Sequence, residues 1–126
     1  VEEVHPQVEA DFTTMMIAVG IENDQIAQHF GKAENLRLFD VSKGKIIQTR
    51  DVMDTIHLKH ERAAYLKSLG VDHILVQHMG KSMYNHFLRY GIQAVQAQST
   101  NINEALRLFL EDPAVKRELN PCQSCQ

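Results

Sequence analysis

The sequence predicts a single α/β domain built around a mixed β-sheet. The chain has 126 residues, the size of one ordinary domain, and its 44% hydrophobic and 23% charged residues are typical of a globular protein. Three short apolar segments come first, and strand and helix patterns then alternate. Strands that follow helices join a sheet through crossovers, so we expect three layers with the element order βββαβαβα.

Five segments have strand patterns. Residues 15–21 (MMIAVGI) are apolar and partly β-branched, as in a buried strand. Residues 36–41 and 45–52 flank a tight turn, which predicts an antiparallel hairpin. Residues 71–77 and 92–97 each follow a helical segment, so we expect both strands to run parallel to a neighbour.

Three segments have helical patterns. Residues 58–69 place apolar side chains on one face and end at Gly70, and residues 81–90 end at Gly91. Residues 103–111 have Asn101 or Asn103 as the helix cap, and Pro113 stands just beyond their end. All three segments have the length of ordinary globular helices.

The remaining segments lack sustained periodicity. Residues 22–34 form a polar loop with room for one helical turn, and residues 113–126 form a polar tail. Residues 1–14 are acidic, and we expect a flexible extension or a remnant of cloning. These boundaries predict one functional domain over residues 15–112.

Composition excludes several classes of protein. The formal net charge is −3, whereas nucleic-acid-binding domains carry a basic stripe. No apolar run is long enough to cross a membrane, and the first residues lack a secretory signal pattern. Both cysteines, Cys122 and Cys125, stand together near the C-terminal end, where they cannot staple the fold. We therefore expect a cytoplasmic protein without nucleic-acid or membrane partners.

Four of the seven histidines converge in the predicted topology. If the first strand pairs antiparallel with the second, the loops after strands one, three, four and five share the carboxyl edge of the sheet, where open α/β sheets bind ligands. Imidazole is the commonest metal ligand in proteins, and two of these histidines are spaced to share one side of a helical turn. The predicted metal ligands at this edge are His29, His57, His60 and His78.

The predicted edge is also cationic. Lys32, Lys59 and Lys81 lie close in sequence to the histidines, and two helix N-termini point toward the same edge. Gly31 and Gly80 allow close approach of the backbone to a bulky ligand. Together these features favour an anionic, metal-containing ligand over a bare cation.

Ordinary structural roles remain open for single residues at this edge and beyond it. A loop histidine is often a solvated or capping residue, and we expect His73 and His86 to serve structure and packing. The lysines could form an ordinary solvated rim. Cys122 and Cys125 form a CxxC pair, which can bind one soft metal or form a disulfide. We include this pair as an accessory metal site.

Several segments resemble the dinitrogenase iron–molybdenum cofactor biosynthesis family, which includes the NifX and NafY accessory proteins and the C-terminal domain of NifB. The resemblance covers about residues 15–111. It rests on MMIAVGI, the loop His29-Phe30-Gly31, LRLFDV, GVDHILVQ with His78-Met79-Gly80, and YGIQAV. The resemblance implies a ribonuclease-H-like fold with a five-stranded mixed sheet. It also implies a cofactor-binding domain for an iron–molybdenum cofactor, its iron–sulfur precursor or a related molybdenum cluster.

Family members are generally carriers rather than catalysts, so we expect a non-enzymatic carrier that exchanges its cluster with donor and acceptor proteins. The match to the loop motif falls on His29, and the match to the glycine turn falls on Gly80. The sequence leaves open whether the protein forms a homodimer. The expected cofactor contacts are His29, Phe30, Gly31, Lys32, Lys59, Met79, Gly80 and Lys81.

Two alternative functions use the same residues. The first is a metal-dependent hydrolase, for which Asp54 and Glu61 are the nearby carboxylates, although neither has a recognised spacing. The second is a protein-interaction scaffold with incidental histidines. The CxxC tail is not part of the family pattern, and it leaves open an iron–sulfur function outside nitrogenase.

Overall fold

The computed structural model describes residues 14–57 and 61–111. Its strands are β1 (Thr14–Glu22), β2 (Gln25–Ile26), β3 (Asn35–Ser42), β4 (Lys45–Met53), β5 (His73–Val76) and β6 (Gln93–Gln96). The helices are α2 (Glu61–Leu69), α3 (Lys81–Arg89) and α4 (Ile102–Glu111), with a 3₁₀ turn η1 (Phe30–Lys32) after β2. Expectations for residues 1–13, 58–60 and 112–126 lie outside the described residues.

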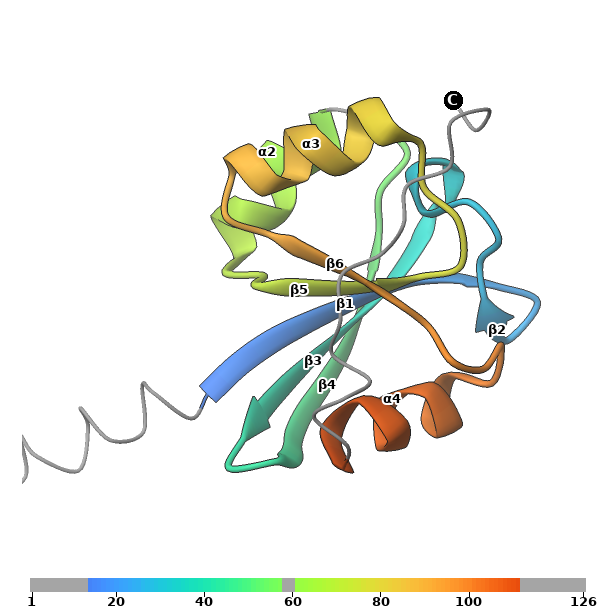
Figure 1. Cartoon of the computed structure of the whole chain (residues 1–126), viewed down its shortest axis with the longest axis vertical. Helices are drawn as coiled ribbons and strands as arrows, with labels where there is room; N and C mark the ends of the chain where they lie inside the picture. The colour runs from blue at the N-terminus through green and yellow to red at the C-terminus, as the bar shows by residue number, and fades with distance from the viewer. Residues whose placement is uncertain (1–13, 58–60, 112–126) are drawn as a thin grey trace, which may run out of the picture.

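The strands form one mixed sheet in the order β4-β3-β1-β5-β6. Strand β1 pairs antiparallel with β3 and parallel with β5, while β4 and β6 complete the two sides. This arrangement confirms the predicted α/β class, the hairpin and the two parallel crossover strands. Figure 1 shows α2 and α3 on one face of the sheet and α4 on the other, which gives three layers.

The sheet has six strands instead of the five that we predicted. The additional strand, β2, has two residues and pairs with the end of β1. Asn23 and Asp24 connect them with φ angles of 56° and 63°, the left-handed conformation of a tight hairpin turn. A strand of two residues is too short to show periodicity, although the Asn-Asp pair is a turn signal.

Two apolar clusters hold the layers together. Ala18 and Leu38 face α2 and α3, where they pack in one cluster with Phe87. Ile17 and Val19 face α4 and pack in the other cluster. Strand β1 is therefore buried on both faces, which explains why residues 15–21 are almost continuously apolar.

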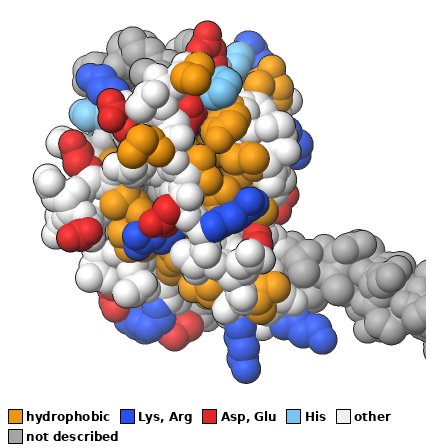
Figure 2. Space-filling model, turned by 180° about the vertical axis from the view of Figure 1, so that it is seen from behind, with side chains coloured by type: hydrophobic (Ala, Val, Ile, Leu, Met, Phe, Trp, Pro, Cys, Tyr) orange, Lys and Arg blue, Asp and Glu red, His pale blue; other side chains and the backbone are white. Residues whose placement is uncertain are grey.

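Strand β4 forms an exposed edge on the side of the molecule seen in Figure 2. Ile47 and Met53 on this strand are 66% and 72% exposed. The ladder between β3 and β4 has a bulge that leaves Ile47 without a partner in β3, a feature that discourages further strand pairing. In the described part of the chain, no helix is long and apolar enough to cross a membrane.

Candidate functional site

The carboxyl edge of the sheet gathers three of the predicted histidines. Strands β1, β4, β5 and β6 run in the same direction, because β4 is antiparallel to β3 and β3 is antiparallel to β1. The connections after β1, β4 and β5 therefore start at this edge, and they carry His29, His57 and His78. The strand directions on which the histidine prediction depends are confirmed.

His29 and His78 are neighbours in space. The backbones of these residues form an isolated parallel bridge, and the ring centroids lie 6.1 Å apart with planes tilted by 40°. Both residues are exposed. The fold thus brings two accessible imidazoles together from separate loops, and we call this pair the histidine rim.

Backbone hydrogen bonds position the loop that carries His29. The Ala27 N–H donates to the Gly20 carbonyl (2.8 Å), and the Ile26 N–H donates to the Thr100 carbonyl (3.0 Å). The side-chain amide of Gln77 donates to the Ile26 carbonyl (2.6 Å). The loop is therefore fastened to β1, to the end of β5 and to the connection before α4. These contacts support a fixed position for His29.

Phe30 anchors the same loop in the core. Its ring is 1% exposed and meets the Phe87 ring edge-on, with centroids 5.9 Å apart. Gly31 is also buried, and Met79 beside His78 packs in the same apolar cluster. Of the expected cofactor contacts, Phe30 and Met79 therefore have side chains inside the core, where they shape the loops beneath the rim.

The surroundings of the two rim histidines differ in charge. An open hollow of about 620 Å³ beside His29 is lined by Glu22, Asp24 and Glu34 as well as Lys32. This part of the edge is more acidic than the cationic rim that we predicted. The hollow beside His78, of about 240 Å³, is lined mainly by uncharged polar residues: Gln77, Gln96, Gln98, Ser99 and Thr100.

Helix α3 adds a favourable field on the His78 side. Its N-cap is Gly80, which supplies no side-chain cap, and Lys81 is exposed in the first turn. The free N–H groups at a helix N-terminus attract anions, and a lysine in the same turn strengthens this attraction. An anionic ligand is therefore better accommodated beside His78 than beside the acidic hollow.

His57 belongs to a separate arrangement that includes Asp54. One carboxylate oxygen, Asp54 Oδ1, accepts hydrogen bonds from the backbone N–H groups of Ile56 (3.1 Å) and His57 (2.9 Å) and lies 3.2 Å from His57 Nδ1. Burial opposes ionisation of Asp54. The hydrogen bonds from His57 and Ile56 and the charge of Arg62 outweigh this effect and lower the pKa of the Asp54 carboxyl below its usual value.

Arg62 links the two histidine-bearing loops from inside the protein. Its side chain is fully buried, and burial lowers the pKa of its guanidinium. Nε donates to the His57 carbonyl (2.9 Å), while the two terminal nitrogens donate to the carbonyls of Phe30 (2.9 Å) and Asp54 (3.0 Å). Nε also lies 3.6 Å from Asp54 Oδ2. One side chain therefore ties the His-Phe-Gly loop to the connection that follows β4.

The His57 ring faces an open groove of about 790 Å³ beside α2 and α3. This ring stacks on Tyr65 at a centroid distance of 4.4 Å and an interplanar angle of 7°. His86, which we expected to serve packing, is half-buried, contacts the Tyr90 ring and also lines the groove. His73 does pack as predicted, with its ring edge-on to Phe109. We call this feature the α2–α3 groove; its lining is Ile56, His57, Glu61, Ala64, Tyr65, Ser68, His86 and Tyr90.

The predicted ligands thus fall into separate groups. His29 and His78 share the rim, whereas His57 lines the α2–α3 groove. Among the described residues, no three His, Cys, Asp or Glu side chains gather closely enough to hold a metal ion by themselves. Lys59, His60, Cys122 and Cys125 lie outside the residues that the structure describes.

Sequence reasoning missed the roles of Asp54 and Arg62. An arginine between Glu61 and Ala63 looks like a solvated helix residue, although its spacing from Leu66 on the buried face is a signal that could have located it inside. An aspartate directly after a strand is a common turn former, which could have pointed to the Asp54 loop. Neither signal predicts that the two side chains meet.

Comparisons with known proteins identify the family. The family model described as "Dinitrogenase iron-molybdenum cofactor" matches residues 13–112. The uncharacterized protein MJ0580 of Methanocaldococcus jannaschii is 30% identical over 109 residues, which cover 82% of this chain and 92% of that protein.

Solved structures share the fold at low sequence identity. The crystal structure of PH0822 has a TM-score of 0.70 at 19% identity and covers 76% of this chain and 88% of its own. That of MJ0327 from Methanocaldococcus jannaschii has a TM-score of 0.70 at 15% identity, covering 86% and 98%. The apo form of the orange protein from Desulfovibrio gigas has a TM-score of 0.66 at 18% identity, covering 85% and 94%. The resemblance found in the sequence is confirmed: the chain belongs to the dinitrogenase iron–molybdenum cofactor family.

Proposed function

We propose that the protein is a carrier of an anionic metal–sulfur cluster in the biosynthesis of iron–molybdenum cofactor or a related cluster, and that the histidine rim holds the cargo. The observation that carries this proposal is the pairing of His29 and His78, whose ring centroids are 6.1 Å apart. Family membership supports the class of cargo. The cargo is the iron–molybdenum cofactor, its iron–sulfur precursor or a related molybdenum cluster.

A cluster needs few protein ligands, because its own sulfides occupy most coordination positions of its metals. One or two imidazoles can therefore attach it where a bare metal ion would require three or four protein donors. Exposed rims of this kind also allow the cargo to leave, as a carrier requires. Among the described residues no three His, Cys, Asp or Glu side chains form a site for a bare metal ion, and a cluster attached by one or two imidazoles does not need one.

The charge distribution supports one side of the rim for the body of the cluster. The uncapped N-terminus of α3, Lys81 and the polar side chains of Gln98, Ser99 and Thr100 lie on the His78 side. The carboxylates beside His29 repel an anion. We infer that the body of the cluster lies on the His78 side of the rim. His29 then binds the part of the cluster that faces it.

We infer four further properties from the family: the fold, the partners, the location and the absence of catalysis. The fold is ribonuclease-H-like, supported by the antiparallel strands β1, β3 and β4 followed by the parallel strands β5 and β6. Partners are cluster donor and acceptor proteins, and the protein acts in the cytoplasm without catalysing a reaction. The exposed side chains of Ile47 and Met53 on β4 are available for contact with such a partner or with a second copy of the chain, and sedimentation analysis with and without cluster distinguishes these cases.

The hydrolase alternative has less support. A hydrolytic zinc site needs three protein ligands, an open position and a nearby general base. Asp54 is 4% exposed and already accepts hydrogen bonds from His57 and Ile56, so it is not available as that base. Zinc-dependent turnover of phosphate or amide substrates would favour the hydrolase over the carrier.

Anaerobic binding tests the proposal. The full chain is mixed with isolated iron–molybdenum cofactor and separated by size exclusion, and iron and molybdenum in the protein fraction are measured. We expect co-elution and a changed absorption spectrum for the wild-type protein, and loss of both for His29→Ala/His78→Ala. Lack of co-elution with the wild type, or equal co-elution with both proteins, would contradict the proposal.

A further inference from the structure

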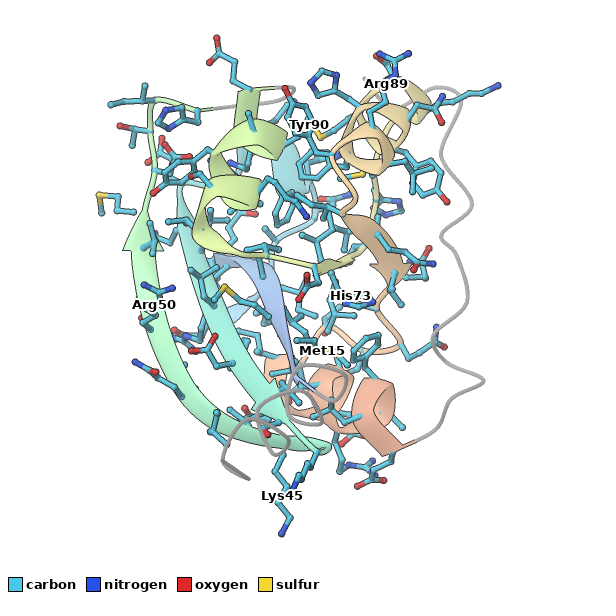
Figure 3. All side chains as sticks on the ribbon, turned by 90° about the vertical axis from the view of Figure 1, so that its left-hand side faces the viewer. Met15, Lys45, Arg50, His73, Arg89 and Tyr90 are labelled. Carbon is cyan, nitrogen blue, oxygen red and sulfur yellow. The ribbon has the colours of Figure 1, made fainter. Side chains whose placement is uncertain are left out.

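The α2–α3 groove contains histidines that the rim does not use. His57 and His86 line this groove together with the rings of Tyr65 and Tyr90, and none of these residues lines the hollows beside His29 and His78. Figure 3 shows Tyr90 at the end of the molecule where α2 and α3 lie, opposite Lys45. The groove is therefore a second place where imidazoles line an open hollow.

The His57 ring is held in one orientation by contacts on several sides. Its face stacks on Tyr65 at 4.4 Å, and Nδ1 lies 3.2 Å from Asp54 Oδ1. The His57 backbone is fixed as well, because its N–H donates to Asp54 and its carbonyl accepts from Arg62. Ligands held by surrounding groups in this way lose little freedom when they bind a metal.

The same contacts determine which ring nitrogen can bind. An ionised carboxylate can only accept hydrogen bonds, so Asp54 requires the proton of neutral His57 to be on Nδ1. The lone pair is then on Nε2, the nitrogen at the outer end of the ring. A carboxylate behind a histidine is the usual second partner of a metal-binding imidazole, because it fixes the tautomer and increases ligand basicity.

The groove suits a metal centre that brings most of its own ligands. No three donor side chains gather there among the described residues, so a bare ion lacks a complete coordination shell. The side chains of Ile56, Tyr65 and Tyr90 provide apolar walls beside the two imidazoles, and Glu61 adds one carboxylate. Since a carboxylate repels an anionic cluster, this combination favours a chelated metal cation.

We propose that the α2–α3 groove is a second metal-attachment site, in which His57 binds a partly ligated transition-metal centre through Nε2, His86 offers a second imidazole from α3, and Asp54 is the positioning residue for His57. The site is separate from the histidine rim, and the proposal stands whether or not the rim carries a cluster.

The tautomer of His57 gives the first test, which the wild-type protein alone can already fail. Long-range ¹H–¹⁵N correlation spectra of the full chain at a pH where the ring is neutral distinguish Nδ1–H from Nε2–H. We expect Nδ1–H for His57, and in Asp54→Asn a mixture with Nε2–H. A merely structural role of Asp54 would leave the tautomer unchanged. Predominant Nε2–H in the wild-type protein would overturn the proposal.

Binding is measured with Cu(II)–iminodiacetate, a paramagnetic chelate with open positions for imidazole. We expect the wild-type protein to show broadened resonances of Tyr65 and Tyr90 on titration, and His57→Ala to lose this broadening. Asp54→Asn keeps an oxygen for the backbone donors but removes the charge, and we expect it to weaken binding in the groove by roughly 10–100-fold, as for other outer partners of metal-binding histidines.

The matched control is His29→Ala/His78→Ala, which removes the rim and leaves the groove intact. We expect this double variant to retain the broadening of the Tyr65 and Tyr90 resonances. The experiment thus tests metal binding in the groove separately from cluster binding at the histidine rim. Circular dichroism verifies that each variant is folded. Broadening at Tyr65 and Tyr90 that survives His57→Ala, or an affinity that is unchanged in a folded Asp54→Asn variant, would contradict the proposal.

Discussion

Replacing Arg62 by methionine tests the internal link between the two histidine-bearing loops. Methionine has a similar length and no hydrogen-bond donors, so the change keeps much of the buried volume while it removes the guanidinium. The carbonyls of Phe30, Asp54 and His57 each lose a donor at 2.9–3.0 Å. The Asp54 carboxylate also loses the cation whose Nε lies 3.6 Å from Oδ2.

The expected loss of stability is large for a single substitution. Removing one member of a buried ion pair costs about 3–5 kcal/mol, because the partner charge remains buried without compensation. A carbonyl left without a donor costs about 1–3 kcal/mol, although water can reach some of them once the loops relax. Since these effects overlap, we expect about 4 kcal/mol, a substantial part of the roughly 5–15 kcal/mol that stabilises an ordinary domain.

Urea denaturation followed by circular dichroism measures this loss, with Arg50→Met as the matched control. Arg50 is exposed on β4, so its replacement should change the free energy of unfolding by less than about 0.5 kcal/mol. Ring proton contacts between His29 and the His78 loop should weaken in Arg62→Met, because the Phe30 carbonyl is released. Equal stability of Arg62→Met and Arg50→Met would refute the assignment of Arg62 as the link between the loops.

Three further outcomes follow from packing and charge. A Cβ on Gly20 would lie 2.9 Å from the Cβ of Ala33, which is too close for an ordinary contact. In urea denaturation, Gly20→Ala should therefore lower the free energy of unfolding by about 1–3 kcal/mol, and Ala33→Gly in the same chain should restore part of it. Phe87→Ala empties a fully buried ring position and should lower the free energy of unfolding by about 3–5 kcal/mol; an effect below that of an exposed alanine substitution would contradict the core assignment. The hydrogen bond from Arg37 lowers the pKa of Asp51, so this pair stabilises the fold above the ordinary carboxyl pKa, and its contribution fades as the pH falls through the lowered value. A carboxyl NMR titration should show the Asp51 pKa rising to its ordinary range in Arg37→Gln.

The architecture could be predicted from the sequence because each long element has its own local signal. The apolar run around Ile17, the hairpin turn at Gly44 and the helix ends at Gly70 and Gly91 all mark elements that the structure contains. Elements that depend on tertiary contacts were not predicted well. The short strand β2 forms because its residues meet the end of β1, and β5 and β6 are shorter than the apolar segments that include them.

The site was partly predictable for the same reason. Strand directions followed from the order of elements, and they were sufficient to bring His29 near His78. Sequence position could not tell that His57 turns toward the α2–α3 groove, because its orientation depends on stacking against Tyr65 in the next helix. Nor could it reveal that buried Arg62 compensates the carboxylate behind that histidine, since an arginine is usually solvated.

The most direct test of the central claim is detection of a bond between a rim imidazole and a metal of the cargo. The full chain is labelled with ¹⁵N-histidine, loaded anaerobically with iron–molybdenum cofactor and examined by electron spin-echo modulation. The proposed carrier function predicts modulation from a directly bound imidazole nitrogen that is reduced in His29→Ala and in His78→Ala and lost in the double variant. Loaded protein without such modulation, or with modulation unchanged in the double variant, would contradict cluster attachment at the histidine rim.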